Sequence, residues 1–405
     1  MATNKEQNKL NVPHLRFPEF HGEWEEHGLS EYLDFKNGLN PDSKRFGKGI
    51  KFISVMDILN NPVITYDCIR ASVQATDAEM SSFSVENGDI LFQRSSETLE
   101  DVGRANVYID DKVAVFGGFV IRGKKKANYN PLFFRYLLSS PYARKRIIPM
   151  GAGAQHFNIG QEGLSKVLLN FPSIEEQTKI ASLLHLLDER IATQSKLIED
   201  LKKLKSAIIV EHYRQTEKNE VCVADLGNHF NVGNLAKDDL SETGKPCIIY
   251  GELFTTYGEI ISQIESHTNK TEGMILSKKG DLLFPSSTTV DAVSLIAPSV
   301  INVDNVILGG DMFGIHINHN YNTQYLSYYF NHIAKKQLAK FAKGSTIIHL
   351  HYTDIEKAKL LLPSLEEQNR MAKCLVALDK KVSVEQNLLS SLTCQKSYLL
   401  QQMFI

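Results

Sequence analysis

The chain repeats itself at an offset of about 191 residues, and this repeat constrains its fold more than any other feature. The motif PSIEEQ at Pro172–Gln177 returns as PSLEEQ at Pro363–Gln368, and 9 of 21 positions are identical between residues 171–191 and 362–382. A repeat this long is a duplicated domain unit, because solenoid repeats span only about 20–50 residues. We therefore predict two related halves, which suits a target that itself has two halves.

The repeat extends upstream into short apolar runs bounded by Gly, Asp and Asn, which are typical of strands and turns. The matched segments are Gly88–Phe92 with Gly280–Phe284, Gly117-Gly118 with Gly309-Gly310, and Lys51-Phe52-Ile53 with Cys247-Ile248-Ile249. Between these segments the two copies share little. Either two domains with different binding preferences or drift in unconstrained loops would produce this pattern.

Each copy continues into helical sequence. A short aromatic-rich helix is predicted at residues 130–138 and 322–330, and a basic cluster and a glycine-containing loop follow it in both copies. Two stretches without Gly or Pro then run from about Ser173 to Tyr213 and from about Ser364 to Met403. Their apolar residues recur at spacings of three and four, which predicts a coiled-coil seam. The seam residues are Ile180, Leu184, Leu187, Ile191, Ile198, Leu201 and Ile208, with Met371, Leu375, Leu378, Val382, Leu389, Leu392 and Leu399 as their counterparts.

We predict that the two long helices bury these seams against each other. The alternation of domain and helix makes such a pair antiparallel, with one domain at each end of a rod of about 60 Å. The alternatives are that each helix packs on its own domain or pairs with another molecule. The predicted fold is thus α+β, with two pseudo-two-fold related domains joined by an antiparallel coiled coil. The expected boundaries are residues 1–170, 171–215, 216–361 and 362–405.

The composition is that of an ordinary globular protein. The net charge of −2 over 405 residues carries no global basic signature of nucleic-acid binding, although local basic runs occur. Five scattered Cys residues without a C-x-x-C pair suggest neither a disulfide framework nor a zinc site. No segment has the length of a membrane span, and we expect a cytoplasmic protein.

Motifs that would carry chemistry are absent from the sequence. It contains no Walker A loop, no H-E-x-x-H and no G-x-S-x-G. His349-Leu350-His351 has the spacing of half a metal site, but a polar loop is the simpler interpretation. No nucleophile–base arrangement recurs in both halves. These observations favour a binding protein over an enzyme.

The duplicated motifs, in this order, resemble the specificity subunit of type I restriction–modification systems over essentially the whole chain. The N-terminal residues Val12–Phe20, followed by Gly22-Glu23-Trp24, resemble the start of that family's first target-recognition domain. The second copy departs from the first, because it lacks the Pro-x-Leu-Arg-Phe start. It also has Ile347-Ile348-His349 where the first copy has His156-Phe157-Asn158.

The resemblance implies that each target-recognition domain reads one half of a split, asymmetric double-stranded DNA site. The helical pair would set the distance between the halves, about one helical turn. It would also dock two methyltransferase (modification) subunits, which use S-adenosylmethionine to methylate adenine. Restriction subunits with ATP-driven translocase and nuclease activity would join them. This chain would supply specificity without catalysis and without a cofactor, since S-adenosylmethionine, ATP and Mg would belong to the partner subunits.

Three groups of residues are candidates for DNA contact. Short polar side chains that follow each Gly-Asp strand suit base edges, the glycine loops suit base or backbone contact, and basic residues suit phosphates. The first group is Arg94, Ser95, Ser96, Thr98, Ser286, Ser287 and Thr288; the second is Gln155, His156, Asn158, Thr346 and His349; the third is Lys44, Arg45, Lys48, Arg144, Lys145, Lys335 and Lys336.

Two other classes of function fit the same pattern. One is a stand-alone DNA-binding regulator that homodimerises through its helices, and it predicts tight DNA binding without a methyltransferase. The other is a scaffold whose paired domains bind protein or glycan, and it predicts no dependence on DNA sequence.

Overall fold

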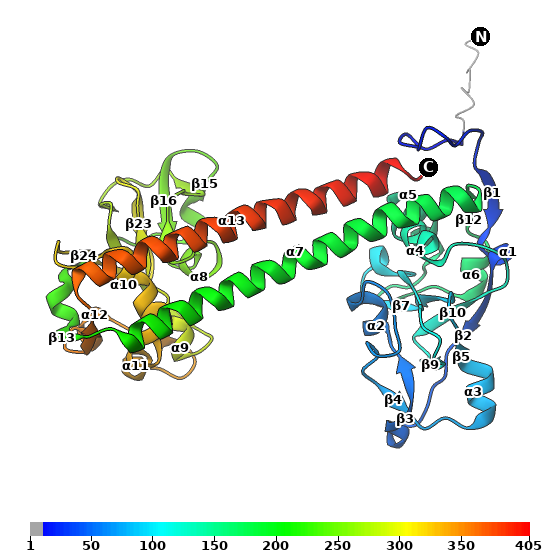
Figure 1. Cartoon of the computed structure of the whole chain (residues 1–405), viewed down its shortest axis with the longest axis horizontal. Coiled ribbons are helices and arrows are strands. Elements are labelled where there is room, and N and C mark those ends of the chain that lie inside the picture. The colour runs from blue at the N-terminus through cyan, green and yellow to red at the C-terminus, as the bar shows by residue number, and fades with distance from the viewer. Residues whose placement is uncertain (1–10) are drawn as a thin grey trace, which may run out of the picture. The chain divides into compact units, whose positions relative to one another are not determined.

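The computed structural model describes residues 11–405; residues 1–10, with which the predicted first domain begins, lie outside the described residues. The chain divides into two compact units (Figure 1). Unit 1 contains the residues up to Ser195 together with Asn387–Ile405, and unit 2 contains Lys196–Gln386. Each unit therefore includes part of both long helices, and the division of domains from helices at residues 170, 215 and 361 stays a prediction.

Unit 1 contains two four-stranded sheets, with strand orders β2-β10-β6-β8 and β4-β3-β9-β5, and two two-stranded ladders, β1-β12 and β7-β11. The first sheet is antiparallel, whereas β3 and β9 of the second run parallel. The strands are β1 Glu25–Gly28, β2 Leu33–Asn37, β3 Phe46–Ile53, β4 Ser72–Val73, β5 Ser84–Val85, β6 Ile90–Gln93, β7 Ser95–Ser96, β8 Ala105–Val107, β9 Ala114–Phe116, β10 Val120–Lys125, β11 Phe157–Asn158 and β12 Leu168–Phe171.

Unit 2 repeats these sheets in the same order and adds one strand to each. The orders are β14-β24-β20-β22-β17 and β15-β18-β16-β23-β19, and the ladders are β13-β26 and β21-β25. The strands are β13 Asn219–Cys222, β14 Gly227–Asn231, β15 Leu240–Ser241, β16 Lys245–Ile249, β17 Ile260–Ile261, β18 Ser266–Thr268, β19 Ile275–Leu276, β20 Asp281–Pro285, β21 Ser287–Thr288, β22 Ser299–Ile301, β23 Ile307–Gly309, β24 Met312–Ile317, β25 Ile348–His349 and β26 Lys359–Leu362.

The strand registers give the residue-by-residue match between the copies. Phe52 pairs with Val115 in unit 1, and Cys247 pairs with Ile307 in unit 2. Gly117-Gly118 follows Phe116 of β9, and Gly309-Gly310 follows Leu308 of β23, so Val115 corresponds to Ile307. Their strand partners, Phe52 and Cys247, therefore correspond as well. The sequence alignment, which matched Lys51 with Cys247, was therefore wrong by one residue in this strand.

Short helices cover the sheets. The predicted aromatic-rich helices are present, and Asn130 and Asn322 cap them by accepting a hydrogen bond from a backbone N–H of the first turn. The helices of unit 1 are α1 Leu29–Tyr32, α2 Val55–Asn60, α3 Asp77–Phe83, α4 Pro131–Ser139, α5 Pro141–Ile147 and α6 Gln161–Ser165; those of unit 2 are α8 Glu252–Thr255, α9 Ala292–Leu295, α10 Thr323–Tyr329, α11 Lys335–Leu338 and α12 Tyr352–Ile355.

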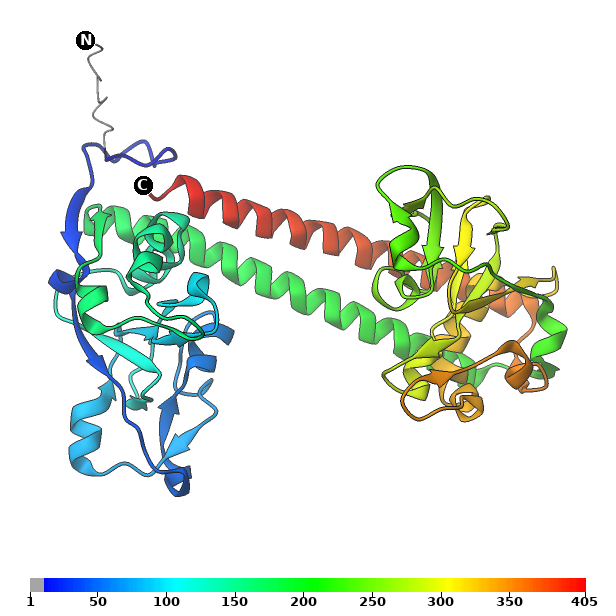
Figure 2. The same ribbon diagram turned by 180° about the vertical axis from the view of Figure 1, so that it is seen from behind.

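The two long helices are α7 (Ile174–Gln215) and α13 (Leu365–Gln402), as the sequence predicted (Figures 1 and 2). In unit 1 the first half of α7 shares a core with the last turns of α13, through residues such as Leu184 and Leu399. In unit 2 the last turns of α7 share a core with the first half of α13, through Ile209 and Leu375. The helices therefore run antiparallel within each unit.

The same two cores also contain the helices and sheets of each domain. Leu184 lies in one cluster with Phe133 and Trp24, and Leu375 lies in one cluster with Tyr325 and Phe284. The long helices thus pack on each other and on the domains together, so two arrangements that the sequence presented as alternatives coexist. None of the helices in residues 11–405 combines the length and apolarity that a membrane crossing requires.

The glutamine of the repeated PS-x-EEQ motif joins each long helix to its domain. Gln177 accepts a hydrogen bond from the Asn130 N–H (3.1 Å) and donates one to the Pro172 carbonyl (3.0 Å). Gln368 makes the same pair of bonds, with the Asn322 N–H (3.0 Å) and the Pro363 carbonyl (2.9 Å). Both side chains are almost fully buried, so these bonds fix the start of the long helix against the cap of α4 or α10.

Candidate nucleic-acid interface

Three segments of unit 1 meet through their backbones at the end of β6. The Arg94 N–H donates to the Phe119 carbonyl (2.9 Å), and the Ile159 N–H donates to the Arg94 carbonyl (2.9 Å). Beyond Arg94, β7 pairs with β11, with Ser95 opposite Asn158. We call residues 94–98, 119 and 155–158 the unit 1 platform. It brings together two of the three groups of residues that the sequence predicted separately.

Unit 2 builds the same arrangement with the same backbone bonds. The Ser286 N–H donates to the Asp311 carbonyl (2.7 Å), and the Leu350 N–H donates to the Ser286 carbonyl (2.9 Å). Ser287 of β21 lies opposite His349 of β25. Residues 286–289, 311 and 346–349 are called the unit 2 platform. Each residue of the unit 1 platform except Thr98 therefore has a defined counterpart in the unit 2 platform.

A glycine turns the chain back at each platform. Gly153 has φ +148° and Gly344 has φ +118°, both in the region that favours glycine. A Cβ at either position would lie 2.0 Å from the carbonyl oxygen of His156 or Ile347. The glycine loops are therefore tight hairpins, and the residues at their tips, Gln155, His156 and Thr346, are exposed.

Apart from Phe119 and Phe157, the side chains on the unit 1 platform are polar and at least partly accessible. Arg94 donates from Nη1 to the Gly118 carbonyl (3.2 Å), and the Ser95 hydroxyl donates to Asn158 Oδ1 (2.5 Å). Thr98 Oγ1 donates to an Asp101 carboxylate oxygen (2.9 Å). Ser96 is half-buried. An Arg beside an Asn and a Ser is a set of donors and acceptors suited to base edges.

The side chains on the unit 2 platform differ in chemistry. Ser286 and Ser287 are buried, and Ser287 Oγ donates to Asp311 Oδ2 (2.7 Å). Thr288 Oγ1 accepts from the Val290 N–H (3.2 Å). The exposed ring of His349 stacks on that of His351, with centroids 6.1 Å apart. Unit 2 thus presents an acidic and an imidazole group where unit 1 presents Phe119 and an amide.

Phe119 and Asp311 are the functional candidates that the sequence analysis missed. Phe119 is 70% exposed although it is aromatic, and Asp311 is also exposed. Each immediately follows the glycine pair that is repeated in both copies, Gly117-Gly118 or Gly309-Gly310. An aromatic residue in one copy and an acidic residue in the other, directly after the same glycine pair, would have identified both positions from the sequence.

The predicted phosphate-binding residues lie on other elements. Lys44, Lys48, Lys145 and Lys336 are exposed, and Lys335 is half-buried. In unit 2, α11 carries the two adjacent lysines and packs on α9, which itself contacts both strands of the platform ladder. These positions leave the exposed lysines available to an anionic partner.

Arg45 and Arg144 are engaged within the protein. The Arg45 guanidinium pairs with the Glu79 carboxylate, which holds the pKa of Glu79 at about 2. Arg144 donates from Nη2 to the carbonyls of Glu100 (2.8 Å) and Val102 (2.6 Å). Burial, and then the neighbouring charge of Arg104, lowers the pKa of Arg144 to about 10. Arg144 therefore supports the backbone that continues from the unit 1 platform.

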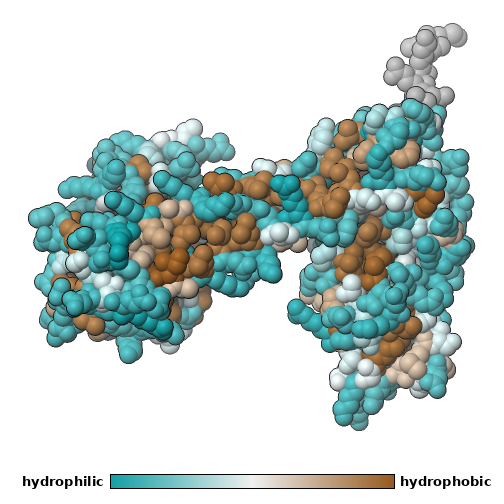
Figure 3. Space-filling model, viewed as in Figure 1, coloured by the Kyte–Doolittle hydropathy of each residue, from teal (hydrophilic) through white to brown (hydrophobic). Residues whose placement is uncertain are grey.

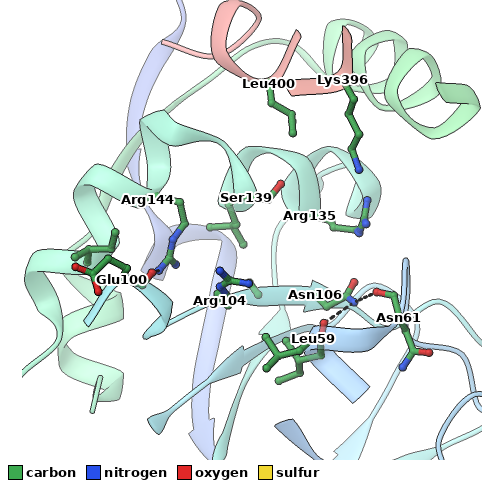
Figure 4. A pocket seen from close by; sticks show the side chains of 14 residues that line it. Leu59, Asn61, Glu100, Arg104, Asn106, Arg135, Ser139, Arg144, Lys396 and Leu400 are labelled. Atoms are coloured by element: carbon green, nitrogen blue, oxygen red, sulfur yellow. Dashed lines mark hydrogen bonds between the residues drawn. The ribbon is translucent and has the colours of Figure 1, made fainter. Parts of the chain in front are cut away.

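Arg144 lines a pocket of about 500 Å³ in unit 1, together with Arg104, Arg135 and Lys396 (Figure 4). Its walls come from α2, β8, α4, α5 and the end of α13. Arg135 Nη1 lies 3.1 Å and Lys396 Nζ 2.5 Å from the Asp188 carboxylate. Since Asp188 belongs to α7, this one carboxylate ties both long helices to α4.

Unit 2 repeats this charged cluster around Asp379, the counterpart of Asp188. Lys205 Nζ of α7 lies 2.7 Å from Asp379 and 3.0 Å from Glu259, and His332 Nε2 lies 2.9 Å from Glu259. The Tyr328 hydroxyl donates to Asp379, as the Tyr136 hydroxyl does to Asp188. Burial alone would raise the pKa of Glu259, but the bond from His332 and the charge of Lys205 lower it to about 2. These clusters hold the fold together.

No group of three or more His, Cys, Asp or Glu side chains within residues 11–405 is arranged to hold a metal ion. His349, for which the sequence predicted a polar loop, lies instead in β25 and pairs across the platform ladder with Ser287.

Comparison with known proteins identifies the family to which this chain belongs. The family model described as type I restriction modification DNA specificity domain matches the chain twice, over residues 21–203 and 216–393. Two proteins of Methanocaldococcus jannaschii that are designated type I restriction enzyme specificity subunits align along nearly the whole length. The first, MjaX, is 23% identical over 94% of this chain and 92% of its own; the second, MjaVIII, is 21% identical over 95% and 92%.

Solved structures have the same fold. The S subunit of a type I restriction–modification system from M. genitalium superposes with a TM-score of 0.60 at 17% identity, and the match covers 97% of this chain and 99% of that one. A chain from a study of complex assembly in the type I restriction–modification system superposes with a TM-score of 0.57 at 14% identity, covering 93% and 96%.

Proposed function

Because this chain belongs to the type I restriction–modification DNA specificity family, we propose that each of its two units reads one half of a split DNA site through its platform. The chain is the DNA specificity subunit of a type I restriction–modification complex. It is a non-catalytic recognition subunit that acts with DNA and with the other subunits of that complex.

The observation that carries the proposal is the duplicated platform with unlike side chains. The backbone bonds of the two platforms correspond one to one, whereas the side chains differ at Arg94 and Ser286, at Phe119 and Asp311, and at Asn158 and His349. Because base pairs are distinguished by their donors, acceptors and methyl groups, unlike platforms select unlike half-sites. The site is therefore asymmetric. Exposed lysines such as Lys145 and Lys336 hold the DNA backbone.

The long helices carry apolar side chains that nothing within their own unit covers. In unit 1, Leu186 is 63% and Tyr398 is 57% exposed; in unit 2, Leu204 is 48% and Val384 is 60% exposed. Brown patches interrupt the hydrophilic surface along the helices (Figure 3). Exposed apolar surface of this kind marks a protein interface. We assign it to the docking of modification subunits, one for each unit and hence two in the complex, with restriction subunits joining that core.

The continuous helices also set the spacing of the half-sites, because both are shared by the two units. The chain holds no cofactor of its own, and S-adenosylmethionine, ATP and Mg belong to the partner subunits. None of its five cysteines forms a disulfide, which supports a cytoplasmic location.

The proposal is tested by selecting DNA from a pool of randomised duplexes with the chain purified together with its modification subunit. We expect enrichment of one motif with two unlike specified halves and an unspecified spacer. A symmetric motif bound equally well without the modification subunit would instead identify a homodimeric regulator, and no enrichment would identify a scaffold.

Docking is tested separately by co-purification. Leu186→Asp places a charge on the exposed apolar face of α7 and should weaken recovery of the modification subunit. Lys203→Asp changes a charge on the same helix at a side chain that is also exposed and serves as the matched control. Equal recovery with both variants would contradict the docking assignment.

A further inference from the structure

The position held by Phe119 in unit 1 and Asp311 in unit 2 is a defined point of each platform. Its carbonyl accepts the N–H of the residue that follows β6 or β20, Arg94 or Ser286. Residues hydrogen-bonded in this way lie roughly 5 Å apart, comparable with the rise between neighbouring base pairs of about 3.4 Å. A side chain at this position therefore reaches the same base pair as its bonded neighbour or the adjacent one.

Phe119 is the most exposed aromatic side chain among the large apolar residues of unit 1. It borders an apolar hollow of about 420 Å³ that is lined by Phe46, Phe52 and Met56 and also by Ser95 of the platform. Phe46 is 43% and Met56 is 61% exposed. Phe52 belongs to a core cluster of unit 1, whereas Phe46, Met56 and Phe119 at the rim of the hollow remain exposed. The hollow suits an apolar group presented by a ligand next to the polar platform.

Asp311 has the opposite chemistry and is held in place. Its Oδ2 accepts from Ser287 Oγ at 2.7 Å, and Ser287 is itself only 3% exposed. The buried hydroxyl therefore orients an exposed carboxylate on the platform. A carboxylate accepts hydrogen bonds and donates none when ionised, so it selects for an amino group and against an acceptor.

Resting on the proposed function, we propose that Phe119 and Asp311 are specificity-determining residues, one in each unit. Phe119 contacts the methyl group of a thymine in the first half-site, since this methyl is the apolar feature of the major groove. Asp311 accepts a hydrogen bond from the exocyclic amino group of a cytosine or an adenine in the second half-site. Arg94, bonded to Phe119 through the backbone, reads the same or the adjacent base pair, and a guanine is its preferred partner.

The test uses the complex with the modification subunit and the half-sites that the wild-type complex selects. For Phe119, the thymine is replaced by uracil, which removes the methyl group alone. We expect this change to weaken binding by the wild-type complex roughly 5- to 10-fold and to leave binding by the Phe119→Ala complex unchanged. An equal loss in both complexes, or a first half-site without a thymine, overturns the assignment of Phe119.

For Asp311, the selected cytosine or adenine is replaced by the analogue that lacks its exocyclic amino group, which also distinguishes the two bases. Wild-type binding should fall roughly 10-fold, and the Asp311→Ala complex should not discriminate. Asp311→Asn, which adds a donor, should shift the selected base towards adenine. An unchanged second half-site in both variants overturns this assignment.

The two halves of the motif serve as controls for each other. Phe119 variants should alter the first half only, and Asp311 variants the second half only, so the unaltered half reports that the complex is folded and assembled. If the wild-type complex selects no split motif, the proposed function fails. If it selects one and the variants leave it unchanged, only the present inference fails.

Discussion

The charged clusters around Asp188 and Asp379 are alike, whereas the platforms of the same two units are not. Asp188 binds Lys396 and Tyr136, and Asp379 binds their counterparts, Lys205 and Tyr328. On the platforms, Phe119 corresponds to Asp311 in backbone position but not in chemistry. The duplicated unit has therefore kept the groups that hold helices to domains and changed the groups that face outwards. Buried charge pairs tolerate little change, because loss of one partner leaves the other uncompensated.

The largest effect is expected where the cluster is most buried. Lys205→Met removes the cation between Asp379 and Glu259 and should destabilise unit 2 by roughly 3–5 kcal/mol. Lys396→Met should cost less, because Lys396 is more exposed and Asp188 keeps Arg135. Chemical denaturation followed by circular dichroism, with fluorescence of the single Trp24 as a reporter of unit 1, checks both values. Equal losses for the two variants would contradict this ranking of Lys205 above Lys396.

Lowering the pH should destabilise the two clusters over different pH ranges. The pKa of Glu259 is held at about 2, below its ordinary 4.5, so its ionised form stabilises unit 2 fully above about pH 4.5. That contribution is lost as the pH falls from 4.5 towards 2. In unit 1 burial raises the pKa of Asp188, yet Lys396 and Tyr136 bring it below its ordinary 3.8, so the loss there begins at lower pH.

Denaturation at a series of pH values between 6 and 3 measures this difference. The transition of unit 2 should move to lower denaturant concentration before the Trp24 signal of unit 1 does. The Lys205→Met variant should show a weaker dependence in unit 2, because the charge that favours ionised Glu259 is gone. A dependence as steep as that of the wild type would contradict the role given to Lys205.

Gln177 and Gln368 provide a comparison in which the two units should respond alike. Replacing either residue by Leu leaves a backbone N–H and a carbonyl without their partners and should cost roughly 1–3 kcal/mol in its own unit. Exposed Gln395 and Gln386 on α13 are matched control positions where Leu should change little. A loss in one unit only would break the equivalence of the two helix starts.

The platforms should behave oppositely to these buried groups. Arg94→Ala is expected to leave stability nearly unchanged and to weaken binding to the cognate site by ~1–3 kcal/mol through loss of a base contact. Ser286→Ala, at the corresponding position, should have a smaller effect because the Ser286 side chain is buried. Titration of cognate and unrelated duplexes separates the two cases. Unchanged specific affinity in Arg94→Ala would remove Arg94 from the interface.

The sequence predicts the elements of this structure better than its site. The seam of Leu184 and Leu375 follows a period that local sequence encodes, and both long helices and their antiparallel pairing were predicted correctly. The pairing of Ser95 with Asn158 joins segments about sixty positions apart that have no periodic pattern, so their proximity was not predictable. For the same reason, only the structure shows that Arg45 pairs with Glu79 and that Arg144 donates to the Glu100 carbonyl.

The central claim is that this chain gives a type I modification enzyme its DNA sequence specificity through two unlike platforms. The most direct test is long-read mapping of N6-methyladenine in cells that carry the chain and its modification subunit, compared with cells from which the chain is deleted. A split motif with two different halves should be present in the first and absent in the second. Methylation that is identical with and without the chain would contradict the account.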